Sequence, residues 1–207
     1  MIQQRFQLLP QRLKELRGAF VQTCRNDVPG LLAARTYAQH FTDILTRAFD
    51  TESLSDERWA LLAVGGFGRG ELSFASDLDL LFLYRKRLPQ VLQDVVRELV
   101  YGLWDSGFEV GHVTASVSAV KRLVNEDFTI LTNHLEARLI AGDPQLFASW
   151  RESYLKSFGT QSRRRFFQEL LRFREGRLVH YGESSYLLEP HVKEGVGGLR
   201  DIHLLRW

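Results

Sequence analysis

The sequence predicts an α+β fold, in which a small sheet is flanked by N-terminal and C-terminal helices. Two short apolar runs, 61–64 and 78–84, bracket a glycine-rich turn, and a third run with β-branched residues follows at 108–118. Apolar runs of this length between turn residues are typical of buried strands. Apolar residues recur at helical spacing before the first run and after the third.

The N-terminal region predicts two helices. Apolar residues recur at helical spacing over 11–50, and Pro29 with Gly30 interrupts the pattern. The polar stretch 51–56 predicts a connecting loop. We therefore expect a helical segment over 1–56 that packs on the sheet.

Further helices are expected beyond the central stretch, at 89–105, 127–140, 144–158, 162–181 and from residue 199 onward. The helix at 162–181 carries six arginines in its sequence, which suits either a solvated surface or a cationic wall for a nucleotide or an acidic partner. These helices predict a division into a sheet-bearing core at 57–120 and a helical region with a glycine-rich closing motif at 121–207.

The composition fits a soluble globular protein, with 44% hydrophobic and 25% charged residues. A formal net charge of +2 is too small to indicate a nucleic-acid binder. The single cysteine, Cys24, excludes an internal disulfide, and the N-terminus lacks the apolar core of a signal peptide. No apolar run reaches the roughly 18 residues of a membrane span. We expect a cytoplasmic protein with neither nucleic-acid nor membrane partners.

The candidate chemistry lies in the central stretch 61–84. Asp77 and Asp79 are two residues apart at the start of an apolar run, so period-two geometry places them on one face of the strand. Their mutual repulsion is relieved by a divalent cation, and Mg²⁺ prefers carboxylates combined with substrate phosphates. The sequence therefore predicts a Mg²⁺ site.

The glycine turn at Gly65 and Gly66 complements that site. Free backbone N–H groups at a turn that enters a helix bind anions, and Arg69 adds a planar donor for phosphate. Each piece alone is weak evidence, because a strand with two outward aspartates is usually only a solvated face. A dinucleotide fold is disfavoured because Asp77 follows the glycines too soon to bind a ribose.

The joint pattern is more specific. Gly-Gly-x-Gly-Arg-Gly-Glu, followed by Ser-Asp-x-Asp at the start of an apolar strand, resembles the polymerase β-type nucleotidyltransferase superfamily. Within it, VGGFGRGEL, SDLDLLFL and the distant YLLEPHVKEGVGGLRDIHLLRW resemble the nucleotidyltransferase domain of the bacterial PII uridylyltransferase/uridylyl-removing enzymes. One departure is Val196, where those relatives carry proline.

The resemblance implies a small mixed sheet and a Mg²⁺-dependent transfer of UMP from UTP to a tyrosine hydroxyl of the PII nitrogen-regulatory protein, with release of pyrophosphate. Asp77 and Asp79 would hold the metal, and Glu109 would complete the acidic set as a metal ligand or proton acceptor. The implied nucleotide-binding residues are Gly65, Gly66, Arg69, Ser76, Lys193 and Arg200.

Two alternatives remain open at this point. One is a nucleotidyltransferase with another nucleotide or acceptor, and the other is a nucleotide-sensing regulatory module without turnover. In the uridylyltransferase/uridylyl-removing enzymes that this sequence resembles, a His-Asp doublet marks the hydrolase domain, and this sequence lacks such a doublet. We therefore expect a fragment or short relative that holds transfer chemistry only and does not remove UMP.

Overall fold

The computed structural model describes residues 6, 8–26, 28–49, 59–88, 90–156, 160–182, 189 and 191–207. The chain divides into two compact units, Met1–Arg151 and Glu152–Trp207, and each is described by itself. None of the described helices is long and apolar enough to cross a membrane.

The first unit is built on a four-stranded mixed sheet, as the sequence predicts. Its strands are β1 (Trp59–Ala63), β2 (Leu78–Tyr84), β3 (Val110–Ser116) and β4 (Arg138–Gly142), in the order β3-β2-β1-β4. β1 pairs antiparallel with β2 and with β4, whereas β2 and β3 are parallel. The short helix α4 (Gly65–Gly68) follows β1 directly, which confirms the predicted order of strand, glycine turn, short helix and strand.

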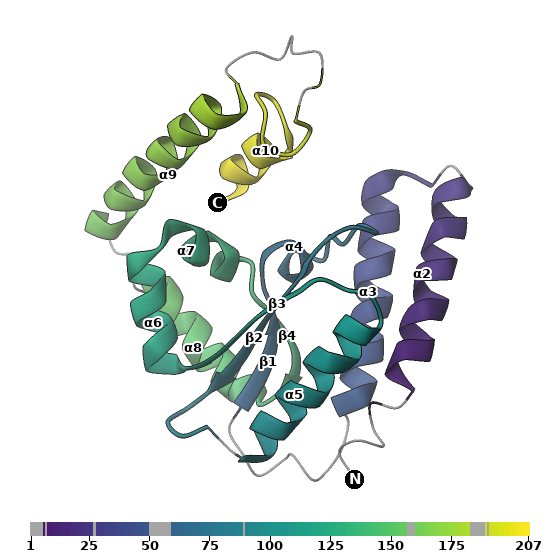
Figure 1. Ribbon diagram of the computed structural model, residues 1–207. Helices are drawn as coiled ribbons and strands as arrows, with labels where there is room; N and C mark the ends of the chain where they lie inside the picture. The colour runs from purple at the N-terminus through teal and green to yellow at the C-terminus, as the bar shows by residue number, and fades with distance from the viewer. Residues whose placement is uncertain are drawn as a thin grey trace. The chain divides into compact units, whose positions relative to one another are not determined.

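Helices cover both faces of this sheet (Figure 1). On one side lie α2 (Leu9–Arg25), α3 (Gly30–Phe49) and α5 (Gln90–Asp105). On the other lie α6 (Val117–Glu126), α7 (Phe128–Leu135) and α8 (Pro144–Lys156). Parallel strands need a crossover, and α5 supplies it between β2 and β3.

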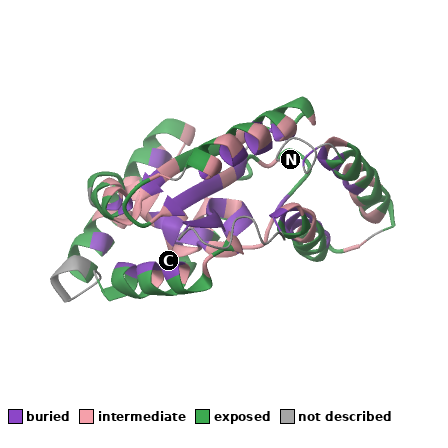
Figure 2. Ribbon diagram, turned by 90° about the horizontal axis from the view of Figure 1, so that it is seen from below, coloured by how far each residue is buried: buried purple, intermediate pink, exposed green. Residues whose placement is uncertain are grey.

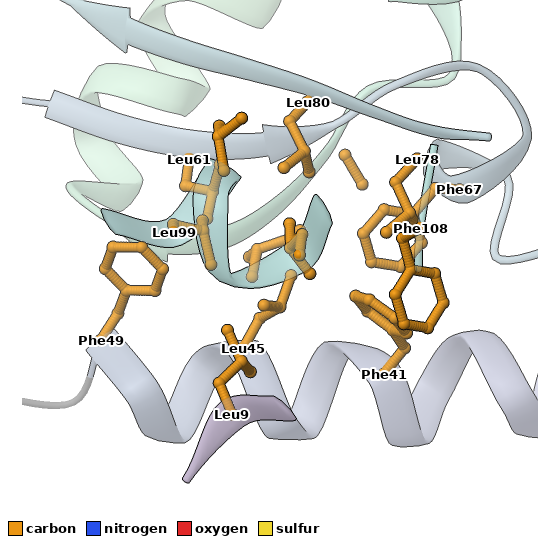
Figure 3. Packing of buried hydrophobic residues seen from close by; sticks show 14 of the residues in the cluster. Leu9, Phe41, Leu45, Phe49, Leu61, Phe67, Leu78, Leu80, Leu99 and Phe108 are labelled. Carbon is orange, nitrogen blue, oxygen red and sulfur yellow. The ribbon is translucent and has the colours of Figure 1, made fainter. Parts of the chain in front are cut away.

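The main core lies between the sheet and α3. Leu61, Leu78 and Leu80 from the strands face Phe41, Leu45 and Phe49 of α3, with Leu9 and Leu99 beside them (Figure 3). Every residue of β1 is buried, and Figure 2 shows the strands enclosed by helices whose buried sides face inward. A sheet covered on both faces explains why β1 and β2 are nearly continuous apolar runs.

One predicted helix is wrong. The helix expected at 127–140 ends at Leu135, and 138–142 forms β4, the partner of β1. Periodicity cannot separate a short apolar run in a strand from one in a helix, and here pairing with β1 decides. The sheet consequently takes a strand from beyond residue 120. Helix α6 was also not predicted; the Ser116 hydroxyl caps it by accepting from the Ala119 N–H at 3.2 Å.

The second unit contains α9 (Thr160–Tyr181) and α10 (Leu199–Arg206), both close to their predicted bounds. Arg177 of α9 is buried and ties the closing motif to this helix. Its guanidinium forms an ion pair with Asp201 and donates to the Glu194 carbonyl at 2.9 Å. Asp201 also accepts from the Gly197 N–H at 2.8 Å, so the glycine loop is fixed within its own unit.

Candidate functional site

The glycine turn forms a tight connection between β1 and α4. Gly65 has a φ of +57°, a conformation that side chains disfavour and glycine adopts readily. The Val64 N–H donates to the Asp79 carbonyl at 3.0 Å, and the Arg69 N–H donates to the Gly65 carbonyl at 3.1 Å. The turn is therefore fastened to the start of β2.

The Asp79 carboxylate lies between two glycines. A Cβ atom on Gly65 would lie 2.8 Å from Asp79 Oδ2, and a Cβ atom on Gly111 would lie 2.8 Å from Oδ1. Both distances are too short for a real contact, so each carboxylate oxygen occupies space that only glycine leaves open. Gly111 is the direct partner of Asp79 in the parallel ladder of β2 and β3.

Asp77 and Glu109 sit at the same edge of the sheet. The ladder begins at Leu78 and Val110, and the Leu78 N–H donates to the Glu109 carbonyl at 2.9 Å. If this pairing is continued by one residue toward the N-terminal end of both strands, Glu109 lies beside Asp77. Because side chains alternate between the two faces of a strand, both then lie on the face that carries Asp79. Both side chains are exposed. The backbone register thus places the three carboxylates at one edge of the sheet, and their joint action on a metal remains a prediction.

His112 lies on the opposite face of β3 from Gly111, because successive residues of a strand alternate between its faces. It pairs in register with the core residue Leu80, and its ring lies 6.3 Å from that of Trp104.

Arg69 is engaged by two carboxylates. Its guanidinium lies 2.5 Å from Glu136 Oε2 and 3.3 Å from Glu71 Oε2, and only 13% of the side chain is exposed. Glu136 stands at the end of α7, so this ion pair joins the glycine turn to a segment 67 residues away in sequence. The expected phosphate contact of Arg69 remains a prediction.

The corner between α7 and β4 supports the turn in two further ways. A Cβ atom on Gly68 would lie 2.4 Å from the Glu136 carbonyl oxygen, so this glycine is a close backbone contact. Arg138 donates to the Phe67 carbonyl at 3.2 Å and to the Thr42 hydroxyl at 3.0 Å, and burial lowers its pKa. Sequence patterns alone gave no chemistry for Glu136 or Arg138.

The remaining predicted nucleotide-binding residues of the first unit lie near the same turn. The Gly66 carbonyl accepts from the Glu71 N–H at 3.0 Å. The Ser76 hydroxyl accepts from the Ser73 N–H at 2.9 Å and closes the turn that leads to Asp77. Their contacts with a nucleotide stay predictions.

Lys193 and Arg200 belong to the second unit. The Lys193 carbonyl accepts from the Arg200 N–H at 2.9 Å, and the Lys193 side chain is exposed. The Arg200 guanidinium lies 3.1 Å from Glu194 Oε1. The expected contact of Lys193 and Arg200 with a triphosphate remains a prediction.

The donor set around Asp79 suits a hard cation. Among the residues that the structure describes, no group of three or more His, Cys, Asp or Glu side chains is gathered to hold a metal ion. Mg²⁺ is typically bound by one or two carboxylates together with substrate phosphates and water. Asp79, with both oxygens facing glycines, and the neighbouring Asp77 fit that requirement.

Comparison with known proteins agrees with the resemblance. A family model described as GlnD PII-uridylyltransferase matches residues 165–207, which do not include Asp77 or Asp79. The bifunctional uridylyltransferase/uridylyl-removing enzyme of Caulobacter vibrioides is 37% identical over 97% of this chain and 22% of its own length. The enzyme of the same name from Phenylobacterium zucineum is 42% identical over 92% of this chain and 22% of its own length.

A third such enzyme, from Rhodospirillum rubrum, is 41% identical over 73% of this chain and 16% of its own length. A solved toxin-antitoxin structure with AMP-PNP aligns to 66% of this chain and 91% of its own at 14% identity, but a TM-score of 0.32 is too low to support an argument. The chain spans about a fifth of the length of the first curated relatives, at 22%. Over nearly all its length, the chain is a sequence relative of the bifunctional uridylyltransferase/uridylyl-removing enzymes.

Proposed function

We propose that this chain carries the transfer site of a uridylyltransferase. It moves UMP from UTP to a tyrosine hydroxyl of a PII nitrogen-regulatory protein and releases pyrophosphate. The observation that carries the proposal is the placement of Asp79, whose carboxylate oxygens each face a glycine where the glycine turn meets β2 and β3. The names of the relatives support UMP as the transferred group.

Each residue has a defined task in this proposal. Asp77 and Asp79 hold Mg²⁺, which when bound offsets the negative charge of the triphosphate. The glycine turn, with Gly65 and Gly66, receives phosphate oxygens. Ser76, Arg69, Lys193 and Arg200 remain candidate phosphate contacts. The contribution of the chain is mostly positioning and charge neutralisation.

The reaction balances without any further reagent. The tyrosine oxygen forms a bond to the α-phosphorus of UTP as the bond from that phosphorus to the bridging oxygen of the β-phosphate breaks. Glu109, exposed beside Asp77, accepts the hydroxyl proton. UMP remains on the tyrosine, and pyrophosphate leaves.

The direct test incubates the purified chain with Mg²⁺, UTP and a PII protein, and follows the mass of PII. A gain of one UMP on tyrosine is expected with wild type and not with Asp79→Asn. Calorimetric titration with each of the four nucleoside triphosphates identifies the base. Transfer of a different nucleotide, or binding without transfer to any acceptor, would replace this proposal with the corresponding alternative.

A further inference from the structure

The side chain of Asn133 approaches the same glycine as Asp79. A Cβ atom on Gly65 would lie 2.8 Å from Asp79 Oδ2 and 3.7 Å from Asn133 Oδ1. The aspartate comes from β2 and the asparagine from α7, and more than fifty residues separate the two in sequence. A group bound at Asp79 therefore lies within reach of the Asn133 amide.

Helix α7 is held firmly at this point. Glu136 follows Asn133 by three residues, a spacing that places both on the same side of a helix. Glu136 forms the ion pair with Arg69, and its carbonyl packs against Gly68. The contacts that anchor α7 to the glycine turn therefore also fix the position of Asn133.

The Asn133 amide is available to a ligand. Within the described part of the chain it makes no hydrogen bond, although the residue is partly buried. Its neighbours on α7 are internally satisfied, since the Thr132 hydroxyl donates to the Thr129 carbonyl at 3.0 Å and His134 Nδ1 bonds the Ile130 carbonyl at 2.6 Å. An amide offers two donors and an acceptor, all of which a bound ligand can use.

We infer that Asn133 is a further positioning residue of the transfer site and that its amide N–H donates to a phosphate oxygen of the bound nucleoside triphosphate. The reason is electrostatic. Asp77, Asp79 and Glu109 place negative charge on this face, so a phosphate needs neutral or cationic donors beside them. Asn133 Oδ1 lies at the Asp79 end of the turn, and rotation of the side-chain amide by half a turn places its neutral N–H donor there instead. This inference rests on nucleotide binding at the proposed site, but not on uridine or on turnover.

The test titrates wild type, Asn133→Ala and Asn133→Asp with Mg²⁺ plus each nucleoside triphosphate, and with Mg²⁺ plus inorganic triphosphate. The alanine variant should raise the dissociation constant about tenfold or more, the effect of losing a hydrogen bond to a charged group. The aspartate variant should weaken binding further, because a carboxylate repels phosphate. The melting temperature of the free protein should stay unchanged in Asn133→Ala, since that change breaks no internal hydrogen bond.

The control is Asn26→Ala, which removes an exposed asparagine at the end of α2 and should leave binding unaltered. Equal affinity in wild type and Asn133→Ala would overturn the inference, and so would retained or tighter binding in Asn133→Asp, which would assign the side chain to the cation. If wild type binds a triphosphate other than UTP, the uridylyltransferase proposal fails while the Asn133 comparison still holds. Absence of any binding by wild type would remove both.

Discussion

Asp79 and Gly111 face each other across the parallel ladder, and the carboxylate occupies the space where a side chain of residue 111 would begin. A Cβ atom there would lie 2.8 Å from Asp79 Oδ1. The orientation of the candidate metal ligand thus depends on the absence of a side chain on the neighbouring strand.

Gly111→Ala should accordingly displace the Asp79 carboxylate. We expect transfer activity to fall at least tenfold, while the free energy of unfolding changes by about 1 kcal/mol, because the clash is with the end of a side chain that can turn aside. The measurements are initial transfer rates and urea denaturation. Gly18→Ala is the matched control, since nothing lies within 4 Å of its added methyl group. In an Asp79→Ala background, Gly111→Ala should have no further effect on activity; a further loss would mean that Gly111 acts on something else.

The aspartate pair should matter for chemistry and not for folding. Asp77→Asn keeps the side-chain shape, removes one negative charge from an exposed position and should change the free energy of unfolding by less than about 0.5 kcal/mol. Transfer should fall by roughly 10²–10³-fold, as when one preorganised stabilising group is lost. Stabilisation by Mg²⁺ plus nucleotide, read from thermal melts, should shrink as well. A variant that melts well below wild type yet keeps Mg²⁺-dependent binding would show the pair to be structural.

Arg69 should stabilise the first unit. Arg69→Ala leaves Glu71 and Glu136 without the cation between them, and we expect the free energy of unfolding to fall by about 3 kcal/mol, the lower end for breaking a buried ion pair. Arg97→Ala, which removes an exposed pair with Asp94, should cost less than about 1 kcal/mol in the same denaturation experiment.

A phosphate contact of Arg69 predicts a second effect of the same variant. Nucleotide binding should weaken by roughly 1.5–3 kcal/mol when it is measured well below the melting temperature. An unchanged dissociation constant alongside lower stability would assign Arg69 to the structure alone.

His134 should make stability sensitive to acid. Burial lowers its pKa below the ordinary value of about 6.5, and the hydrogen bond to the Ile130 carbonyl opposes this only in part. The folded state therefore favours the neutral ring, and its contribution to stability is present above about pH 6.5 and is lost as the pH falls below that value. Below about pH 6.5, the free energy of unfolding of wild type should fall as the pH falls, by at most about 1.4 kcal/mol per pH unit, which is the limit for one proton.

His134→Gln should flatten that dependence. The variant His40→Gln, at an exposed position on α3, should keep the wild-type slope. Identical slopes in wild type and His134→Gln would contradict the role assigned to the buried ring.

Sequence periodicity was sufficient for the long elements. The helices α2, α3 and α5 carry extended apolar stripes, and β1 and β2 are apolar runs on both sides of a turn, so local pattern and tertiary structure agree. Periodicity gave the wrong structure for β4, where it predicted a helix, because these five residues become a strand only through pairing with β1.

The candidate site was predictable where it depends on alternation. The shared face of Asp77, Asp79 and Glu109 follows from period two together with the parallel register. Two contributions were out of reach. The pairing of Arg69 with Glu136 joins residues far apart in sequence, and the closeness of Asn133 to Gly65 depends on how α7 packs. A lone glycine such as Gly111 gives no sign in the sequence of the side chain that it accommodates.

The close contact at Gly68 has a consequence for attempts to transplant the glycine turn. The segment 59–84 is continuous in sequence and could be moved into another protein as one piece. Gly68, however, packs against the Glu136 carbonyl, and the Phe67 carbonyl accepts a hydrogen bond from Arg138. A chimera that imports the turn without 133–138 would set a foreign backbone against Gly68 and leave Arg69 without one of its two carboxylates. The smallest exchangeable module is therefore discontinuous, and its two pieces must move together between proteins.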